Sequence, residues 1–235
     1  MNSLAQKALD AYGGKELWTE SKRIEAEVSV HGFVFTLKRR PFFKHAKIVM
    51  DIARPYSRLT PIGKEAGITG VLDGHDVRLE NQQGEVISER KDARSYFPTG
   101  RRLLYWDDLD MAYFANYAFW NYFTLPALLM REEIDWKEIE PGCFEAIFSK
   151  EIPTHNLVQH FCFDKETGHL IQHDYTAEII SDLAKAANVV LEHARNDEGI
   201  LYTSKRLVTP RSPKGKALPG PTLIAITVHD FRFIK

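Results

Sequence analysis

Histidine and aspartate are the side chains in this sequence that most readily act as acids, bases or metal ligands. Nine histidines are spread along the chain, and the densest group is His155, His160, His169 and His173. The sequence has no His-Glu-x-x-His motif, and on a strand His169 and His173 would lie about 13 Å apart, too far to share one metal ion. We therefore expect no metal site.

Three aspartates, Asp107, Asp108 and Asp110, precede a long apolar segment. They could form an acid–base or metal-binding group. Aspartates at the start of a helix also accept hydrogen bonds from its free N–H groups and complement its dipole, so we interpret them as a helix cap. A Gly-rich phosphate loop and a Gly-x-Ser-x-Gly motif are absent, which argues against nucleotide binding and serine hydrolysis. Catalytic residues stay unknown, and we expect no cofactor.

Residues 111–130 carry no charge, and their length would permit a membrane span. Asn116 and Asn121 are polar, the aromatic residues lie at the centre of the segment, and Pro126 breaks it, so we expect no transmembrane span. Proline suits the first turn of a helix. The segment therefore predicts a helix from about Asp108 to Phe123, followed by a bend and a second short helix.

The first of these helices is apolar on almost every side, which indicates either complete burial or one face on an apolar ligand. Aromatic stripes at helical spacing usually belong to a core. The polar tips of the aromatic residues would need partners, and a ligand could supply some. A basic cluster before the helix either lies in solvent or binds an anionic head group. The candidate ligand-binding residues are Phe33, Phe35, Trp106, Tyr113, Tyr117, Trp120, Asn121, Arg101 and Arg102.

Around this helical plug, residues 106–131, the chain reads as short strands joined by turns. A helix over residues 3–13 comes first, and residues 23–40 predict a hairpin that turns near His31 and Gly32. The pattern predicts a single domain, 1–235, with strands within 23–90 and 134–234. After the hairpin, the predicted strands are 44–52, 56–62, 68–73, 76–80, 85–89, 135–140, 143–149, 157–163, 169–177, 187–195, 200–209 and 222–233.

Composition narrows the class of protein. Hydrophobic residues make up 44 % and charged residues 27 %, which excludes a disordered chain, and a net charge of -1 argues against nucleic-acid binding. Cys143 and Cys162 are the only cysteines and favour a reducing compartment, although a turn near Pro153 could bring their strands together. Residues 1–10 do not resemble a secretory signal. We expect a cytoplasmic protein or a trimmed precursor, without a disulfide.

Several short motifs resemble the lipoprotein-carrier fold of the LolA and LolB type. They are Ala11-Tyr12-Gly13-Gly14 with Trp18, the turn from Asp164 to Leu170, Pro210, and Val228-His229-Asp230-Phe231. The segment from Trp106 to Pro126 also resembles uncharacterised bacterial proteins of this architecture. The resemblance implies a mainly β (α+β) fold: one curved antiparallel sheet of about 11 strands, an unclosed half-barrel with an aromatic helical plug on its concave face. It also implies a cavity for acyl chains, and carriers of this family work outside the inner membrane.

Three functions follow from these observations. The favoured one is non-enzymatic binding of a hydrophobic or amphipathic, lipid-like small molecule between the sheet and the plug. The first alternative is an enzyme acting on such a ligand, with His31, His155, His160, His173 or the Asp107/Asp108 pair as acid or base. The second is a protein-interaction module with a partly exposed aromatic segment. The oligomeric state stays open.

Overall fold

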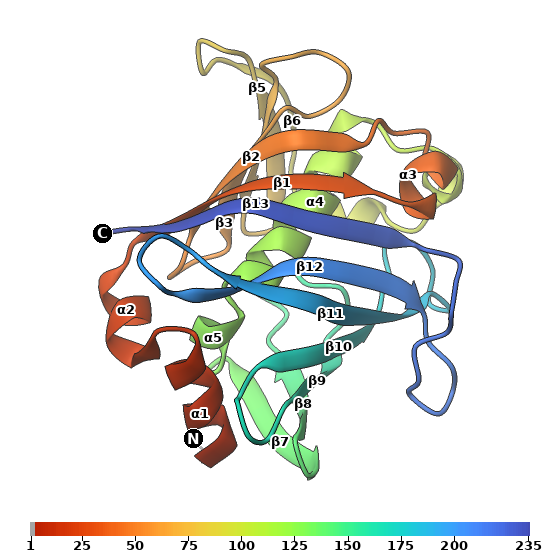
Figure 1. Cartoon of the computed structure of the whole chain (residues 1–235). Helices are drawn as coiled ribbons and strands as arrows, with labels where there is room; N and C mark the ends of the chain where they lie inside the picture. Colours follow the sequence, from red (N-terminus) through yellow and green to blue (C-terminus); the bar gives the residue numbers. More distant parts are fainter. Residues whose placement is uncertain (1–2) are drawn as a thin grey trace.

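A computed structural model describes residues 3–235 and shows one antiparallel sheet that curves around a central helix (Figure 1). The predicted mainly β fold with an unclosed sheet is confirmed, and the sheet has 13 strands where about 11 were expected. The strands are β1 Arg23–His31, β2 Phe43–Asp51, β3 Tyr56–Thr60, β4 Thr69–Asp73, β5 Asp76–Glu80, β6 Val86–Arg90, β7 Ile134–Glu140, β8 Cys143–Phe148, β9 Val158–Phe163, β10 Leu170–Thr176, β11 Lys185–Arg195, β12 Leu201–Pro210 and β13 Ile224–Ile234.

The strand order explains why a helix lies inside the sheet. It runs β6-β5-β4-β3-β2-β1-β13-β12-β11-β10-β9-β8-β7, so that β6 and β7, which are consecutive in the sequence, lie at opposite edges. The chain between them crosses the concave face as α4 (Figure 1). The helices are α1 Ser3–Ala11, α2 Gly14–Glu20, α3 Phe33–Leu37, η1 Ala93–Tyr96, η2 Gly100–Leu103, α4 Asp108–Phe123 and α5 Leu125–Leu128.

Helix α4 begins where its aspartates predict. The side chain of Asp107 accepts a hydrogen bond from the Asp110 N–H at 2.8 Å, and the Asp110 side chain accepts one from the Asp107 N–H at 3.1 Å, forming a capping box. Every residue from Leu109 to Phe123 is buried. Gly70 on β4 permits this close packing, because a Cβ atom there would lie 2.7 Å from the side chain of Ala112.

Two predicted elements differ from the structure. Residues 33–37, expected as the second strand of a hairpin, form the short helix α3 after Gly32, whose φ of 142° suits glycine. The N–H groups of Phe33 and Val34 donate to the carbonyls of Thr222 and Leu223, which fixes the start of α3 against the segment before β13. Five residues are too few to show whether apolar residues repeat with the period of a helix or of a strand, so the pattern did not distinguish the two.

The predicted opening helix is two helices. Gly13 and Gly14 both have positive φ, 103° and 81°, which ends α1 and lets α2 begin in a new direction. Trp18 on α2 is buried and packs edge-on against Phe233 at 4.9 Å between ring centroids. The two helices therefore lie against one end of the sheet, next to α5 (Figure 1).

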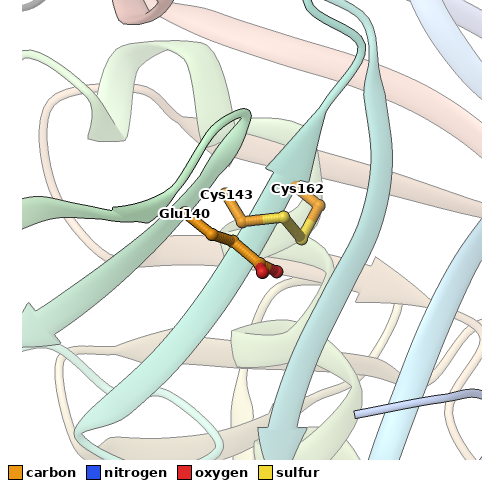
Figure 2. A group of neighbouring side chains, drawn as sticks. All are labelled: Glu140, Cys143 and Cys162. Atoms are coloured by element: carbon orange, nitrogen blue, oxygen red, sulfur yellow. A yellow bond between two sulfur atoms is a disulfide. The ribbon is translucent and has the colours of Figure 1, made fainter.

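Cys143 and Cys162 form a disulfide, so the expectation of two free thiols is wrong (Figure 2). The two residues lie directly opposite each other in the register of β8 and β9, with their Cα atoms 4.0 Å apart. Glu140 lies beside the bridge, and these three residues are the one group within residues 3–235 with metal-ligand spacing. Because the two sulfur atoms are bonded to each other, they offer no thiolate pair to a metal ion.

Candidate functional site

The polar tips of the aromatic helix are satisfied mostly by the protein itself. The Trp120 indole N–H donates to the Asp51 carbonyl at 2.7 Å, and the Tyr113 hydroxyl lies 3.2 Å from Nδ1 of His75. The Asn121 amide donates to the carbonyls of Tyr117 and Pro153 at 2.7 and 2.8 Å. These contacts fix α4 in the sheet, so a ligand is not required to complete most of its hydrogen bonds.

His155 is at the centre of a buried aromatic cluster. Its two ring nitrogens lie 3.1 Å from the Tyr117 hydroxyl and 2.8 Å from the Tyr122 hydroxyl, and its ring stacks on Tyr175 at 3.8 Å. Burial, helped by the positive charge of Arg94, holds the pKa of His155 well below its usual value. The imidazole is therefore neutral and has a structural partner on each nitrogen.

Of the other candidate acid–base histidines, only His173 lies near His155, in ring contact with Tyr122 and Tyr175 at 5.8 and 4.9 Å. His173 is buried and lies 2.6 Å from the Gln159 amide oxygen, while Nε2 of His160 lies 3.3 Å from Glu145. His31 is exposed at the end of β1. The structure does not bring these groups together at either of the two large open cavities described below.

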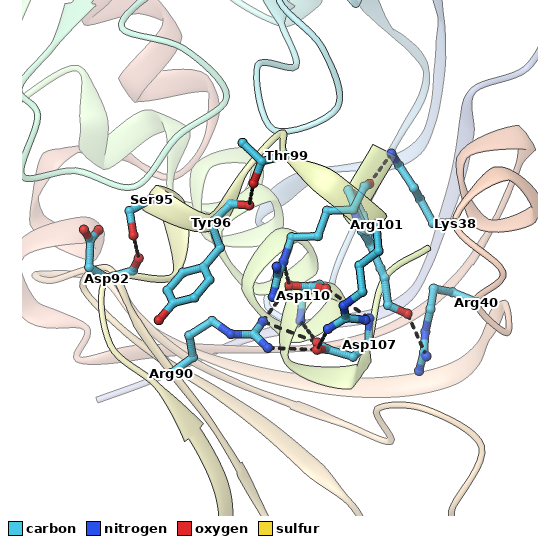
Figure 3. Close-up of polar contacts among 12 residues, drawn as sticks. Lys38, Arg40, Arg90, Asp92, Ser95, Tyr96, Thr99, Arg101, Asp107 and Asp110 are labelled. Atoms are coloured by element: carbon cyan, nitrogen blue, oxygen red, sulfur yellow. Dashed lines mark hydrogen bonds and ion pairs between the residues drawn. The ribbon is translucent and has the colours of Figure 1, made fainter. Parts of the chain in front are cut away.

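The predicted head-group arginines are paired with the aspartates of the α4 cap (Figure 3). Arg101 contacts Asp107 at 2.6 Å, and Arg102 contacts Asp110 at 2.7 Å. Arg90 binds both carboxylates, at 2.8 Å from Asp107 and 2.5 Å from Asp110. The side chain of Asp110 is fully buried, so this cluster neutralises a buried charge. Arg101 and Arg102 therefore hold the start of α4 in place.

The charged residues next to this cluster also have partners within the protein. Burial alone would raise the pKa of Asp107, but hydrogen bonds from Arg90, from the Asp110 N–H and from Arg101 outweigh it and hold this pKa well below the usual range. Asp108 forms an ion pair with Arg40. Lys38, whose pKa burial lowers to about 8 against the attraction of Asp110, donates to the carbonyls of η2. The interpretation of the aspartates as a structural cap is confirmed.

The candidate ligand-binding residues occupy three places. Trp106, Tyr113, Tyr117, Trp120 and Asn121 are buried at α4, with Tyr113 and Tyr117 in ring contact at 5.2 Å. Arg101 and Arg102 lie in the cap cluster. On α3, Phe35 is buried while Phe33 is 49 % exposed. A role of these nine residues in binding a ligand stays a prediction.

The interior next to α4 holds little empty space. One cavity of about 20 Å³ lies between α4 and the centre of the sheet, beside Phe35, Phe114 and Phe119. A second of about 20 Å³ lies beside Arg206, between α5, Trp18 and the sheet. Each volume accommodates about one water molecule, whereas a drug-sized ligand needs several hundred cubic ångströms.

A much larger space opens at the end of the sheet covered by α1 and α2. This groove has a volume of about 850 Å³ and lies between α1, α2, residues 129–132 after α5, and the edge strands β7 and β8. Its apolar side chains come from α1, β7, β8 and the turn after α5: Ala5, Leu129, Met130, Ile134, Trp136 and Phe144. We call it the edge groove. One sequence signal points to it: the apolar Ile134 and Trp136 alternate with charged residues at the start of β7.

Charged residues border the edge groove. Lys15 and Lys137 are on opposite sides of it, on α2 and β7, together with Glu132 and Glu138. Arg131 is held in place by the Ala53 carbonyl at 2.8 Å and by Glu133 at 3.0 Å. The groove therefore combines an apolar lining with a border of both charges, which suits an amphipathic molecule.

A second open cavity, of about 430 Å³, is lined mostly by polar and charged residues. It lies near His75, Arg94 and Glu178. Arg94 contacts Glu178 at 2.5 Å and the Thr154 carbonyl at 2.6 Å, and both His75 nitrogens have partners. Arg94, Glu178 and His75 are therefore already paired within the protein.

Comparison with known proteins rests on structure. No model of a protein family matches the sequence, and no curated protein matches it. The fold is similar to that of a LolA superfamily protein from Nitrosomonas europaea, with a TM-score of 0.54 and 8 % identity over 99 % of this chain and 92 % of that one. A DUF1329 family protein from Desulfovibrio piger gives a TM-score of 0.50 at 14 % identity, over 98 % and 92 % of the two chains.

A putative outer membrane lipoprotein-sorting protein domain from Vibrio parahaemolyticus gives a TM-score of 0.49 and 10 % identity over 98 % of this chain and 90 % of that one.

The prediction of a cytoplasmic location is wrong. The similarity to a LolA superfamily protein contradicts it, and the Cys143–Cys162 disulfide is typical of an oxidising compartment. Within residues 3–235, no helix has the length and hydropathy needed to cross a membrane. The protein has a LolA-like fold, with α4 filling the concave face of its sheet.

Proposed function

We propose that this protein binds a lipid-like amphipathic molecule and that the edge groove holds its apolar part. The observation that carries the proposal is an apolar groove of about 850 Å³ at the end of a LolA-like sheet where α1 and α2 lie. A volume in this range matches ligand-binding sites for small molecules. Sharing a fold with a LolA superfamily protein supports a carrier role, in which the ligand is taken up and later released.

The position of the groove favours reversible binding. Its walls are the helices α1 and α2, the turn after α5, and the edge of the sheet at β7 and β8. Gly13 and Gly14 connect α1 to α2 through two residues of positive φ. A ligand can therefore enter from solvent without moving α4, whose cap and buried hydrogen bonds hold it in the sheet.

A substitution at the border tests this site. Thr19 is exposed on α2 and lines the edge groove, so Thr19→Trp places an indole over its apolar lining. Losing about 60 Å² of apolar contact removes about 1.5 kcal/mol, which weakens binding about tenfold. The measurement is a titration with a fluorescent fatty-acid analogue, followed by competition with unlabelled phospholipid.

Thr36→Trp provides the matched control, because Thr36 is also an exposed threonine on a helix but lies on α3, outside the groove. We expect this variant to bind the analogue as the unmodified protein does. Equal binding by all three proteins would place the ligand outside the edge groove. Absence of any binding by the unmodified protein would refute the proposed function.

A further inference from the structure

Arg206, in the middle of β12, differs from the other buried arginines. It is 2 % exposed, and its side chain reaches the concave interior. Its Nε donates to the Thr203 hydroxyl at 2.9 Å and its Nη2 to the Tyr122 carbonyl at 3.2 Å. Its Nη1 has no hydrogen-bond partner among the residues that the structure describes. One donor of a buried cation is therefore left free.

A counter-charge is also missing. Arg90 and Arg102 each contact a carboxylate, and Arg211, farther along the same chain segment, lies 3.4 Å from Asp174. Within residues 3–235, Arg206 forms no ion pair with an acidic side chain. Arginine stays protonated in proteins, and an unpaired charge in an apolar interior is costly. Aromatic contact with the Tyr122 ring, 5.1 Å away, compensates only in part.

Arg206 also borders a small, partly open cavity. Arg206 and Thr203 line the cavity of about 20 Å³ introduced above, and apolar side chains such as Leu125 and Phe231 form other parts of its wall. This volume accommodates one small polar group. Tyr12 and Trp18, from the α1 and α2 region, close the side away from the sheet. A longer molecule would enter by displacing these helices, which also border the edge groove.

We propose that this cavity binds an anionic group, of carboxylate type, through the Nη1 and Nη2 fork of Arg206. The group supplies the counter-charge that the chain lacks and accepts the free hydrogen bond. Its source is either a free small carboxylate or the acidic end of a single-chain amphiphile. In the second case the inference rests on the proposed function and narrows its ligand class to fatty-acid-like anions.

The test compares ligands that differ only in charge. Isothermal titration of the unmodified protein with decanoate and with decanol measures the effect of the carboxylate, and acetate measures a short anion. We expect decanoate to bind about tenfold more tightly than decanol, because a hydrogen bond to a charged group contributes about that much. Arg206→Gln should remove this preference for decanoate over decanol. Arg206→Lys should keep part of it.

Arg232→Gln is the control, since Arg232 is an exposed arginine paired with Glu25 at 2.8 Å. Equal affinity of the unmodified protein for decanoate and decanol, with no acetate binding, would overturn the inference. This comparison uses only the unmodified protein, so it does not depend on whether a variant folds. Acetate binding that depends on Arg206, without lipid binding, would support the anion site and refute the proposed function. Binding of decanoate and decanol with equal affinity would support the proposed function and refute the anion site.

Discussion

Asp110, the buried carboxylate in the first turn of α4, is the side chain whose replacement best tests how this helix is held. Asp110→Asn keeps the shape and removes the charge. Arg102 then has no carboxylate partner, while Arg90 keeps Asp107. Breaking a buried ion pair costs about 3 to 5 kcal/mol. Because Arg90 still contacts Asp107 after the substitution, we expect a cost at the lower end of this range. We expect the free energy of unfolding to fall by about 3 kcal/mol and the Tm by about 6 to 12 °C.

Urea unfolding followed by circular dichroism measures this change. Asp182→Asn is the control, because Asp182 is exposed, and it should alter the free energy of unfolding by less than about 0.5 kcal/mol. A double-mutant cycle with Arg102→Gln should show strong coupling, since the second substitution removes the cation that the first leaves unpaired. Additive effects, or a loss below about 1 kcal/mol for Asp110→Asn, would show that the cap cluster does not hold α4.

Three further predictions concern other parts of the fold. Reduction of the Cys143–Cys162 disulfide, whose cysteines are 19 residues apart, should lower the free energy of unfolding by about 3 kcal/mol, measured by melting with and without reductant. Lowering the pH from 7 to 5 should destabilise the protein by up to about 1.4 kcal/mol per pH unit for each of His155 and His173. Their pKa values are depressed by burial, so only the unfolded state binds these protons; a flat urea-unfolding profile would contradict this. Gly70→Ala should cost about 1 to 3 kcal/mol by pushing α4 off β4, and an unchanged Tm would show that the helix can shift freely.

Local signals were sufficient to predict α4 from the sequence. An aspartate at the N-cap, two more in the first turn, an uncharged aromatic segment and Pro126 together defined both its start and the bend after Phe123. The alternating strands were predictable for the same reason, because their period depends only on neighbouring residues. Residues 33–37 were misinterpreted because their conformation depends on contacts with residues 222–223, far along the chain.

Features that join distant segments were not predictable. The disulfide depends on the register between β8 and β9, and the pairing of Arg102 with Asp110 depends on η2 folding back over α4. The edge groove is assembled from α1, α2, the turn after α5, β7 and β8, none of which indicates a binding site alone. Arg206 lies in an ordinary strand pattern, and its lack of a carboxylate partner is visible only once the surrounding elements are placed.

Native mass spectrometry tests the central claim, that the edge groove binds a lipid-like molecule, most directly. The protein is incubated with a bacterial lipid extract, and the mass of anything bound is determined together with its identity after extraction. We predict one bound amphipathic molecule per chain, at an occupancy that Thr19→Trp lowers and Thr36→Trp leaves unchanged. A spectrum with no bound lipid, or with equal occupancy in all three proteins, would contradict the account.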